Sequence, residues 1–168
     1  MSRLNVDQIY TRTGTGTPAL REMPAFGVEL LNDQAINSNT DTLVEFDTTN
    51  FDFGSYWDGT NFRYQPLIAG YYQFNSTLRL NSDGNLATSF RVSLMKNGSV
   101  YIVSSQIQVT GATWLPSHVT VSHLMYLNGT TDYVHVIGRS TGAAGDLGGT
   151  DDTTIGGCHF SGFLVRPD

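Results

Sequence analysis

The sequence is short of the features that mark several large classes of protein. It contains one cysteine, Cys158, so no intramolecular disulfide can form. That single thiol leaves two interpretations: synthesis in a reducing cytosol, which we favour, or secretion with the thiol buried. No apolar run approaches the ~20 residues that a membrane-spanning helix needs. The segment 1–7 has neither the apolar stretch nor the cleavage site of a signal peptide. We expect no membrane contact.

Positive charge is also scarce. Nine basic residues face fifteen acidic ones in 168 residues, giving a formal net charge of −6. An acidic protein repels the phosphate backbone, and no cluster of Lys and Arg offsets that repulsion. We therefore expect no nucleic-acid partner.

Helix-forming residues are few, whereas Gly, Thr, aromatic and β-branched residues are plentiful. From Pro24 onward, short apolar segments alternate with turn signals. In the longest, 70–80, Tyr72, Phe74, Leu78 and Leu80 fall on one face and polar residues fall mostly on the other. Further segments are expected at 26–30, 42–47, 90–94, 100–103, 119–127, 133–137 and 160–165. This pattern predicts an all-β sandwich or barrel.

Two Asn-Gly pairs punctuate these segments. Asn97-Gly98 is the strongest hairpin signal in the sequence, because both central positions of a type I′ turn require positive φ. Asn128-Gly129 marks a second turn, before the segment 133–137.

Residues 1–22 differ from the rest of the chain. Apolar and polar residues alternate at its start, as in a short strand, and a Thr/Gly-rich stretch follows. We expect an extended N-terminal arm, 1–22, that pairs with a sheet edge of another protein, followed by one β domain, 23–168. The alternative is a frayed terminus. The residues expected to anchor the arm are Leu4, Val6, Ile9 and Tyr10.

Three blocks of the β domain, in the expected order, resemble the globular head of complement C1q and its tumour necrosis factor relatives. The first block spaces aromatic residues ahead of a Gly-x-Tyr-x-Phe motif, and the others are a hairpin and the closing strand. The matching positions are Phe46, Asp52, Trp57, Tyr64, Gly70, Tyr72, Phe74, Asn97, Gly98, Phe160, Gly162 and Phe163. Tyr64 stands where the family usually has Phe, and Ser76 where it has an aromatic residue.

This resemblance implies a ten-strand jelly roll that forms a homotrimer. It also implies that the matching positions belong to the structural core and not to a site, because large rings bury extensive area. The family's secreted members usually carry a signal peptide and a collagen-like stalk, and neither is present here. The arm instead resembles the N-termini of bacteriophage structural proteins, although this second resemblance is short.

Little in the sequence indicates catalysis or a cofactor. The four histidines lack metal-ligand spacing, one cysteine cannot build a structural zinc site, and no Gly-x-Ser-x-Gly motif occurs. We expect no enzyme activity. The one cation worth considering is calcium, which favours clustered carboxylates. Its weak candidate ligands are Asp146, Asp151 and Asp152.

Three functions are compatible with these observations. The leading hypothesis is a phage virion protein, made in the host cytoplasm, whose homotrimer decorates or cements the capsid by pairing its arms with the major capsid protein or another virion protein. The second is the receptor-binding head of a tail or head fibre, with Trp57 and Trp114 as candidate contacts to a host surface glycan. The third is a secreted C1q-like lectin or signalling module.

Overall fold

The computed structural model describes residues 23–81, 87–108, 117–150 and 157–168. These ranges contain thirteen strands and no helix, and five of the strands are only two or three residues long. The strands are β1 (Ala25–Glu29), β2 (Gln34–Ile36), β3 (Thr42–Leu43), β4 (Thr48–Phe53), β5 (Trp57–Asp58), β6 (Arg63–Tyr64), β7 (Gly70–Asn81), β8 (Ser89–Lys96), β9 (Ser99–Gln108), β10 (Ser117–Leu127), β11 (Val134–Thr141), β12 (Gly145–Leu147) and β13 (His159–Pro167). The prediction of an all-β chain is confirmed.

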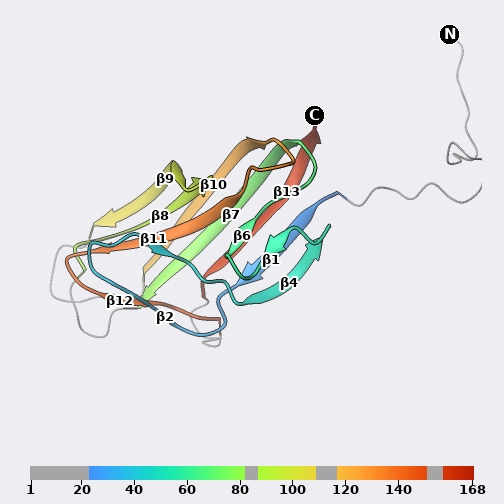
Figure 1. Ribbon diagram of the computed structural model, residues 1–168. Coiled ribbons are helices and arrows are strands. Elements are labelled where there is room, and N and C mark those ends of the chain that lie inside the picture. Colours follow the sequence, from blue (N-terminus) through green and yellow to red (C-terminus); the bar gives the residue numbers. More distant parts are fainter. Residues whose placement is uncertain (1–22, 82–86, 109–116, 151–156) are drawn as a thin grey trace, which may run out of the picture.

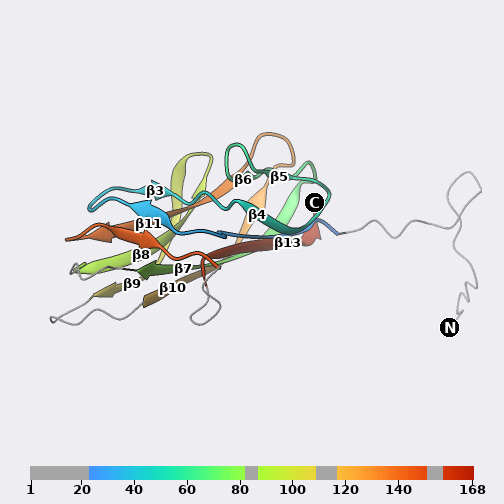
Figure 2. The same ribbon diagram turned by 90° about the horizontal axis from the view of Figure 1, so that it is seen from below.

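The strands form two sheets in which every strand pair is antiparallel. The first sheet runs β10–β7–β13–β1–β4, with the short strands β12 and β2 beside the end of β7. Figure 1 shows this order, with β13 (red) between β7 (green) and β1 (blue). The second sheet runs β5–β6–β11–β8–β9, and β3 also pairs with β11. β1 begins and β13 ends at the same end of the first sheet (Figure 2).

The core lies between the two sheets and follows the period-two pattern of the strands. In β7, Tyr72, Phe74 and Leu78 are fully buried, while Tyr71 and Gln73 on the other face are not. Alternation of this kind is what a strand with one buried face requires. The face predicted for residues 70–80 is confirmed.

Aromatic rings form the centre of this core. Phe26 of β1 stacks on Tyr64 of β6 with 4.1 Å between ring centroids, and meets Phe160 of β13 edge-on at 4.9 Å. Phe46, which lies between β3 and β4, stacks on Phe160 at 5.9 Å. Offset-stacked and edge-on pairs add to the free energy gained from burial alone. Rings distant in sequence therefore hold the two sheets together.

The predicted hairpin joins β8 to β9. Asn97 has φ of 52° and Gly98 has φ of 77°, as both central positions of a type I′ turn require. Asp132 stabilises this turn. Its carboxylate accepts a 2.7 Å hydrogen bond from Nδ2 of Asn97 and forms an ion pair with Nζ of Lys96 at 2.9 Å. The hairpin prediction is confirmed.

Candidate functional site

The outer face of the first sheet presents rows of side chains that the strand register aligns. Residues paired across antiparallel strands point to the same side of a sheet. One row crosses five strands, from the edge strand β4 to β10. It consists of Phe53, Ala25, Phe163, Gln73 and Leu124.

Large apolar side chains gather on this face, near the end where β1 begins. Six of them are between 43 and 50 % exposed, and we call these six residues the apolar face. They are Phe51, Phe53, Tyr71, Leu124, Phe163 and Val165. Exposed apolar side chains gathered on one face of a sheet are a common feature of interaction surfaces.

At one edge of the apolar face, Tyr71 of β7, which belongs to the face, contacts Tyr126 of β10. Tyr71 and Tyr126 are cross-strand partners whose rings meet edge-on at 5.5 Å. The hydroxyl of Tyr126 donates a 3.0 Å hydrogen bond to Oδ2 of Asp168. That hydrogen bond to the carboxylate raises the pKa of the Tyr126 phenol. The interaction holds Asp168 against the edge of the face.

Phe51 lies flat on the sheet because its neighbour has no side chain. A β-carbon on Gly27, the partner of Phe51 in β1, would be 2.6 Å from Cε1 of the Phe51 ring. The ring therefore covers the backbone of Gly27, the arrangement by which aromatic residues compensate for glycine in sheets. Phe51 thereby extends the apolar face toward the middle of β1.

Beyond the apolar face, the same side of the sheet becomes polar. Nε2 of Gln73 donates to Oγ of Ser122 at 3.0 Å, and that hydroxyl donates to Oδ1 of Asn75 at 2.9 Å. The hydroxyls of Thr77 and Thr120 are 3.1 Å apart. These cross-strand hydrogen bonds hold the polar side chains flat on the sheet.

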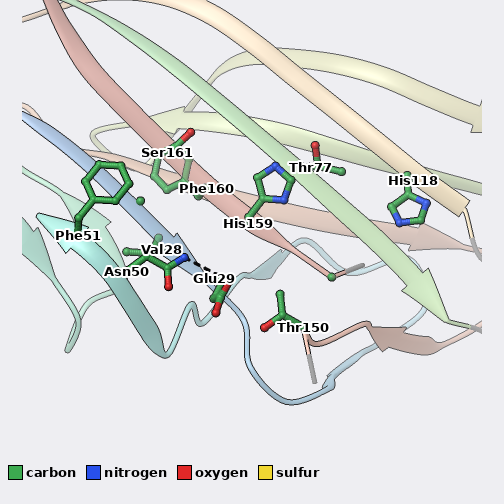
Figure 3. Close-up of a pocket in the computed structure, with 12 residues that line it drawn as sticks. Val28, Glu29, Asn50, Phe51, Thr77, His118, Thr150, His159, Phe160 and Ser161 are labelled. Carbon is green, nitrogen blue, oxygen red and sulfur yellow. Dashed lines mark hydrogen bonds between the residues drawn. The ribbon is translucent and has the colours of Figure 1, made fainter. Parts of the chain in front are cut away.

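A hollow of about 430 Å³ opens at the polar end of this face (Figure 3). His159 and Thr77 are cross-strand partners, and His118 lies on the neighbouring strand β10. On the other side, Nδ2 of Asn50 donates a 3.3 Å hydrogen bond to the carboxylate of Glu29. The polar side chains at its border include Glu29, Asn50, Thr77, His118 and His159. The lining residues are Gly27, Val28, Glu29, Asn50, Phe51, Thr77, His118, Thr150, Gly157, His159, Phe160 and Ser161.

Several residues singled out from the sequence fall outside the described part of the chain. These are the arm residues Leu4, Val6, Ile9 and Tyr10, the aspartates Asp151 and Asp152, and Trp114. The third calcium candidate, Asp146, lies in β12 opposite Asn81 of β7. Within the described ranges, no three His, Cys, Asp or Glu side chains are grouped to hold a metal ion. The same ranges include no helix long and apolar enough to span a membrane.

The histidines and Trp57 occupy different surroundings. His118 and His159 border the hollow, whereas the ring of His123 lies 5.5 Å from that of Tyr101 on β9. His135 stacks on Tyr133 at 5.8 Å, and burial together with the charge of Arg63 lowers the pKa of its imidazole. Trp57 is half-buried and stacks on Phe26 in the aromatic cluster.

Most, but not all, of the positions that carry the C1q resemblance lie in the core. Seven are buried: Phe46, Tyr64, Gly70, Tyr72, Phe74, Phe160 and Gly162. Asp52 is half-buried and serves a turn, because its carboxylate accepts hydrogen bonds from the backbone N–H groups of Tyr56 and Trp57 at 3.2 and 2.9 Å.

Three of the remaining positions correct the expectation of a core role. Phe163 is 46 % exposed, since it is an odd-numbered residue on a strand whose even-numbered residues face the core. Asn97 and Gly98 are exposed at the tip of the hairpin. Phe163 is thus part of the apolar face, which the sequence analysis did not identify. The available signal was the alternation of Phe51 and Phe53 with polar residues.

Comparison with known proteins finds likeness at the level of structure. No family model matches the chain, and no curated protein matches its sequence. The globular domain of zebrafish complement 1qA is similar in structure, with a TM-score of 0.58 and 18 % identity over 88 % of this chain and all of that one. The Eiger tumour necrosis factor of S. frugiperda gives a TM-score of 0.60 at 8 % identity, over 87 % of this chain and 94 % of that one.

A viral protein has the same degree of likeness. The vertex protein P5 of phage PRD1 gives a TM-score of 0.60 at 16 % identity, over 86 % of this chain and 98 % of that one. The chain is therefore an all-β jelly roll of the C1q and tumour necrosis factor type, a fold that it has in common with a phage protein. At these identities the likeness establishes the fold, and function has to be argued from the surface.

Proposed function

We propose that this chain is a non-enzymatic phage virion protein that forms a homotrimer through its apolar face and attaches to the capsid through its N-terminal arm. The observation that carries the proposal is the concentration of six half-exposed apolar side chains on one sheet face. Burying apolar surface contributes ~25 cal/mol per Å². Self-association is the simplest way to remove this face from water.

A ring of three identical subunits needs two different contact surfaces on each subunit. The apolar face supplies one of them. A candidate for the other is β9, the edge strand of the second sheet, where Val100 is 51 % and Tyr101 48 % exposed. In this arrangement, β9 of one subunit packs against the apolar face of the next. The threefold number itself comes from the family resemblance.

Attachment to the capsid is assigned to residues 1–22. The acidic domain begins beside the apolar face, since Met23 precedes β1. Three arms therefore leave the trimer from one end, and their combined binding exceeds that of a single arm because each bound arm raises the effective concentration of the others. The fold of the PRD1 vertex protein supports a place on the particle.

Self-association is tested on the full-length chain by light scattering coupled to size exclusion. We expect a trimer for the unmodified protein and monomers for Leu124→Asp and Phe163→Asp, because each places a charge in the apolar face. The control is Leu67→Asp, at a loop residue that is 67 % exposed and outside the face; it should stay trimeric. A monomeric unmodified protein would refute the proposal.

The arm is tested by removing residues 1–22 and following incorporation into particles. The shortened protein should still form trimers in solution but be absent from purified virions. Incorporation at the normal level would assign capsid attachment to the domain instead. Electron microscopy of particles that carry the full-length protein should place it on the capsid surface.

A further inference from the structure

Two arginines lie directly opposite each other on the outer face of the second sheet. The register pairs Arg139 of β11 with Arg91 of β8. Asp41 precedes β3, which pairs with β11 on its other side. The guanidinium groups of Arg91 and Arg139 both reach Oδ1 of Asp41, at 3.1 and 3.3 Å. One carboxylate oxygen thus serves two cations.

This arrangement leaves positive charge uncompensated. Like charges directly opposite on antiparallel strands are destabilising, and Asp41 is the one carboxylate of the described residues found within 4 Å of either guanidinium. Arg91, Arg139 and Asp41 together carry one net positive charge, on a chain whose net charge is −6. Binding an anion here would remove the remaining repulsion.

Hydrogen-bond donors are left over as well. A guanidinium has five N–H donors in a planar fork, and the contacts with Asp41 use Nη2 of Arg91 and Nη1 of Arg139. Nε of Arg91 is buried, and within the described part of the chain it has no hydrogen-bond partner. The two side chains are about 30 % exposed, so their outer N–H groups remain within reach of a ligand.

The surroundings of the pair are polar but neutral. Gln106 of β9 is the cross-strand partner of Arg91 and is exposed. Thr141 and Ser89 form the next pair on the same face of these two strands, two positions further on. Amide and hydroxyl groups hydrogen-bond to sugar hydroxyls, whereas an extended polyanion would need a longer run of basic side chains.

We propose that Arg91 and Arg139 form a binding site for the carboxylate of an acidic sugar, with Gln106 and Thr141 placed to contact its hydroxyls. A carboxylate matches the guanidinium fork in shape and charge. The site lies on the second sheet, whereas the apolar face lies on the first. Gln106 is near the end of β9, and the proposed trimer contact uses Val100 and Tyr101 at its start. The binding of the sugar therefore requires neither the trimer nor the arm.

The test is calorimetric titration of the full-length protein with glucuronate, glucose and acetate. We expect saturable binding of glucuronate, none of glucose, and weaker binding of acetate, which lacks the hydroxyls. Arg91→Gln and Arg139→Gln should each weaken glucuronate binding roughly tenfold or more, as expected for loss of a charge-assisted hydrogen bond. Asp41→Asn should strengthen it, because Asp41 competes with the ligand for the same donors.

The control is Arg63→Gln. Arg63 is also 30 % exposed and bound to one carboxylate, Asp58, but its guanidinium lies over the ring of Tyr133 and it has no opposite arginine. This variant should bind glucuronate like the unmodified protein. Absence of saturable heat, or equal loss in Arg63→Gln, would overturn the site. Acetate binding as tightly as glucuronate would overturn the sugar assignment, because the site would then recognise a bare anion.

Discussion

Gly162 of β13 lies in direct contact with the ring of Phe74 on β7. A β-carbon on Gly162 would be 2.6 Å from Cδ1 of Phe74 and 2.9 Å from Cε1 of Phe26. Both rings are fully buried in the aromatic cluster. The glycine is required here by space, because the core has no room for even one more methyl group between β13 and the rings.

Gly162→Ala is therefore expected to destabilise the fold. Forcing a methyl group into a well-packed core costs about 1–3 kcal/mol, since rings must shift from their preferred positions. Urea denaturation followed by tryptophan fluorescence measures the change. Gly59→Ala is the matched control, because the added β-carbon would meet its nearest atom, Nε1 of Trp57, at an ordinary 3.6 Å. Equal stability of the two variants would contradict the argument.

A substitution at Tyr64 is expected to stabilise the fold. Its side chain is fully buried, and its hydroxyl has no hydrogen-bond partner among the residues that the structure describes. Burial raises the pKa of this phenol. A buried hydroxyl without a partner costs free energy, so Tyr64→Phe should stabilise the protein, by about 1 kcal/mol. The same denaturation measurement tests this.

Tyr72→Phe provides the comparison for Tyr64. The hydroxyl of Tyr72 donates a 2.8 Å hydrogen bond to the carbonyl of Ile68. Removing the hydroxyl leaves the Ile68 carbonyl without this hydrogen bond and should lower the free energy of unfolding by about 1 kcal/mol. The two Tyr→Phe changes should thus have opposite signs. A loss of stability in both would mean that the Tyr64 hydroxyl has a partner in solution.

The sequence was sufficient to predict an all-β chain because its signals are local and regular. The alternation around Phe74 determines which face of β7 is buried, and the Asn-Gly pair at 97–98 determines the hairpin. The jelly roll itself was implied by the resemblance to C1q heads. The surfaces were harder to predict. The apolar face joins Phe53, Phe163 and Leu124 across five strands, and such a row depends on strand register and sheet order, which no single segment encodes.

The same limitation explains why the arginine pair was missed. Arg91 and Arg139 are 48 positions apart in the sequence and meet only through the pairing of β8 with β11. The resemblance implies a core role for every matching position, Phe163 included. In a strand, however, successive side chains point to opposite faces, so Phe163 faces outward.

Cys158 makes alkaline stability testable. The thiol is fully buried, and burial raises its pKa from 9.0 to about 11. Because the pKa is higher in the folded state, the unfolded chain loses its thiol proton first as the pH rises. The thiol thus contributes to the free energy of unfolding in full below pH 9, and this contribution is lost between pH 9 and 11. Over this interval, the free energy of unfolding should fall by about 2–3 kcal/mol more in the unmodified protein than in Cys158→Ala. Equal pH profiles would show that the thiol titrates normally in the folded state.

Acid stability depends on Asp132, which joins two loops. Its carboxylate accepts bonds from the Asn97 side chain, the Asn128 backbone and Lys96, at 2.7, 3.0 and 2.9 Å. Burial acts to raise the pKa of this carboxyl, but these bonds to the charged form outweigh it and hold the pKa below 3.8. The unfolded chain therefore takes up the proton first, and stability present above pH 3.8 is lost as the pH falls further.

Asp132→Asn should accordingly cost about 1–3 kcal/mol at pH 7, because it leaves Lys96 without its charge partner. The cost should shrink below pH 3.8, where the unmodified carboxyl is also becoming protonated. Urea denaturation at pH 7 and in steps below pH 4 measures both values. Asp58→Asn is the comparison. A hydrogen bond from the Asn61 side chain also lowers the pKa of Asp58, but its ion pair with Arg63 is 30 % exposed on both sides. Such surface pairs contribute about 0–1 kcal/mol, so the cost and its change with pH should be smaller than for Asp132→Asn. A cost for Asp132→Asn that stayed constant with pH would show that neutral hydrogen bonding, and not the charge of Asp132, holds the two loops together.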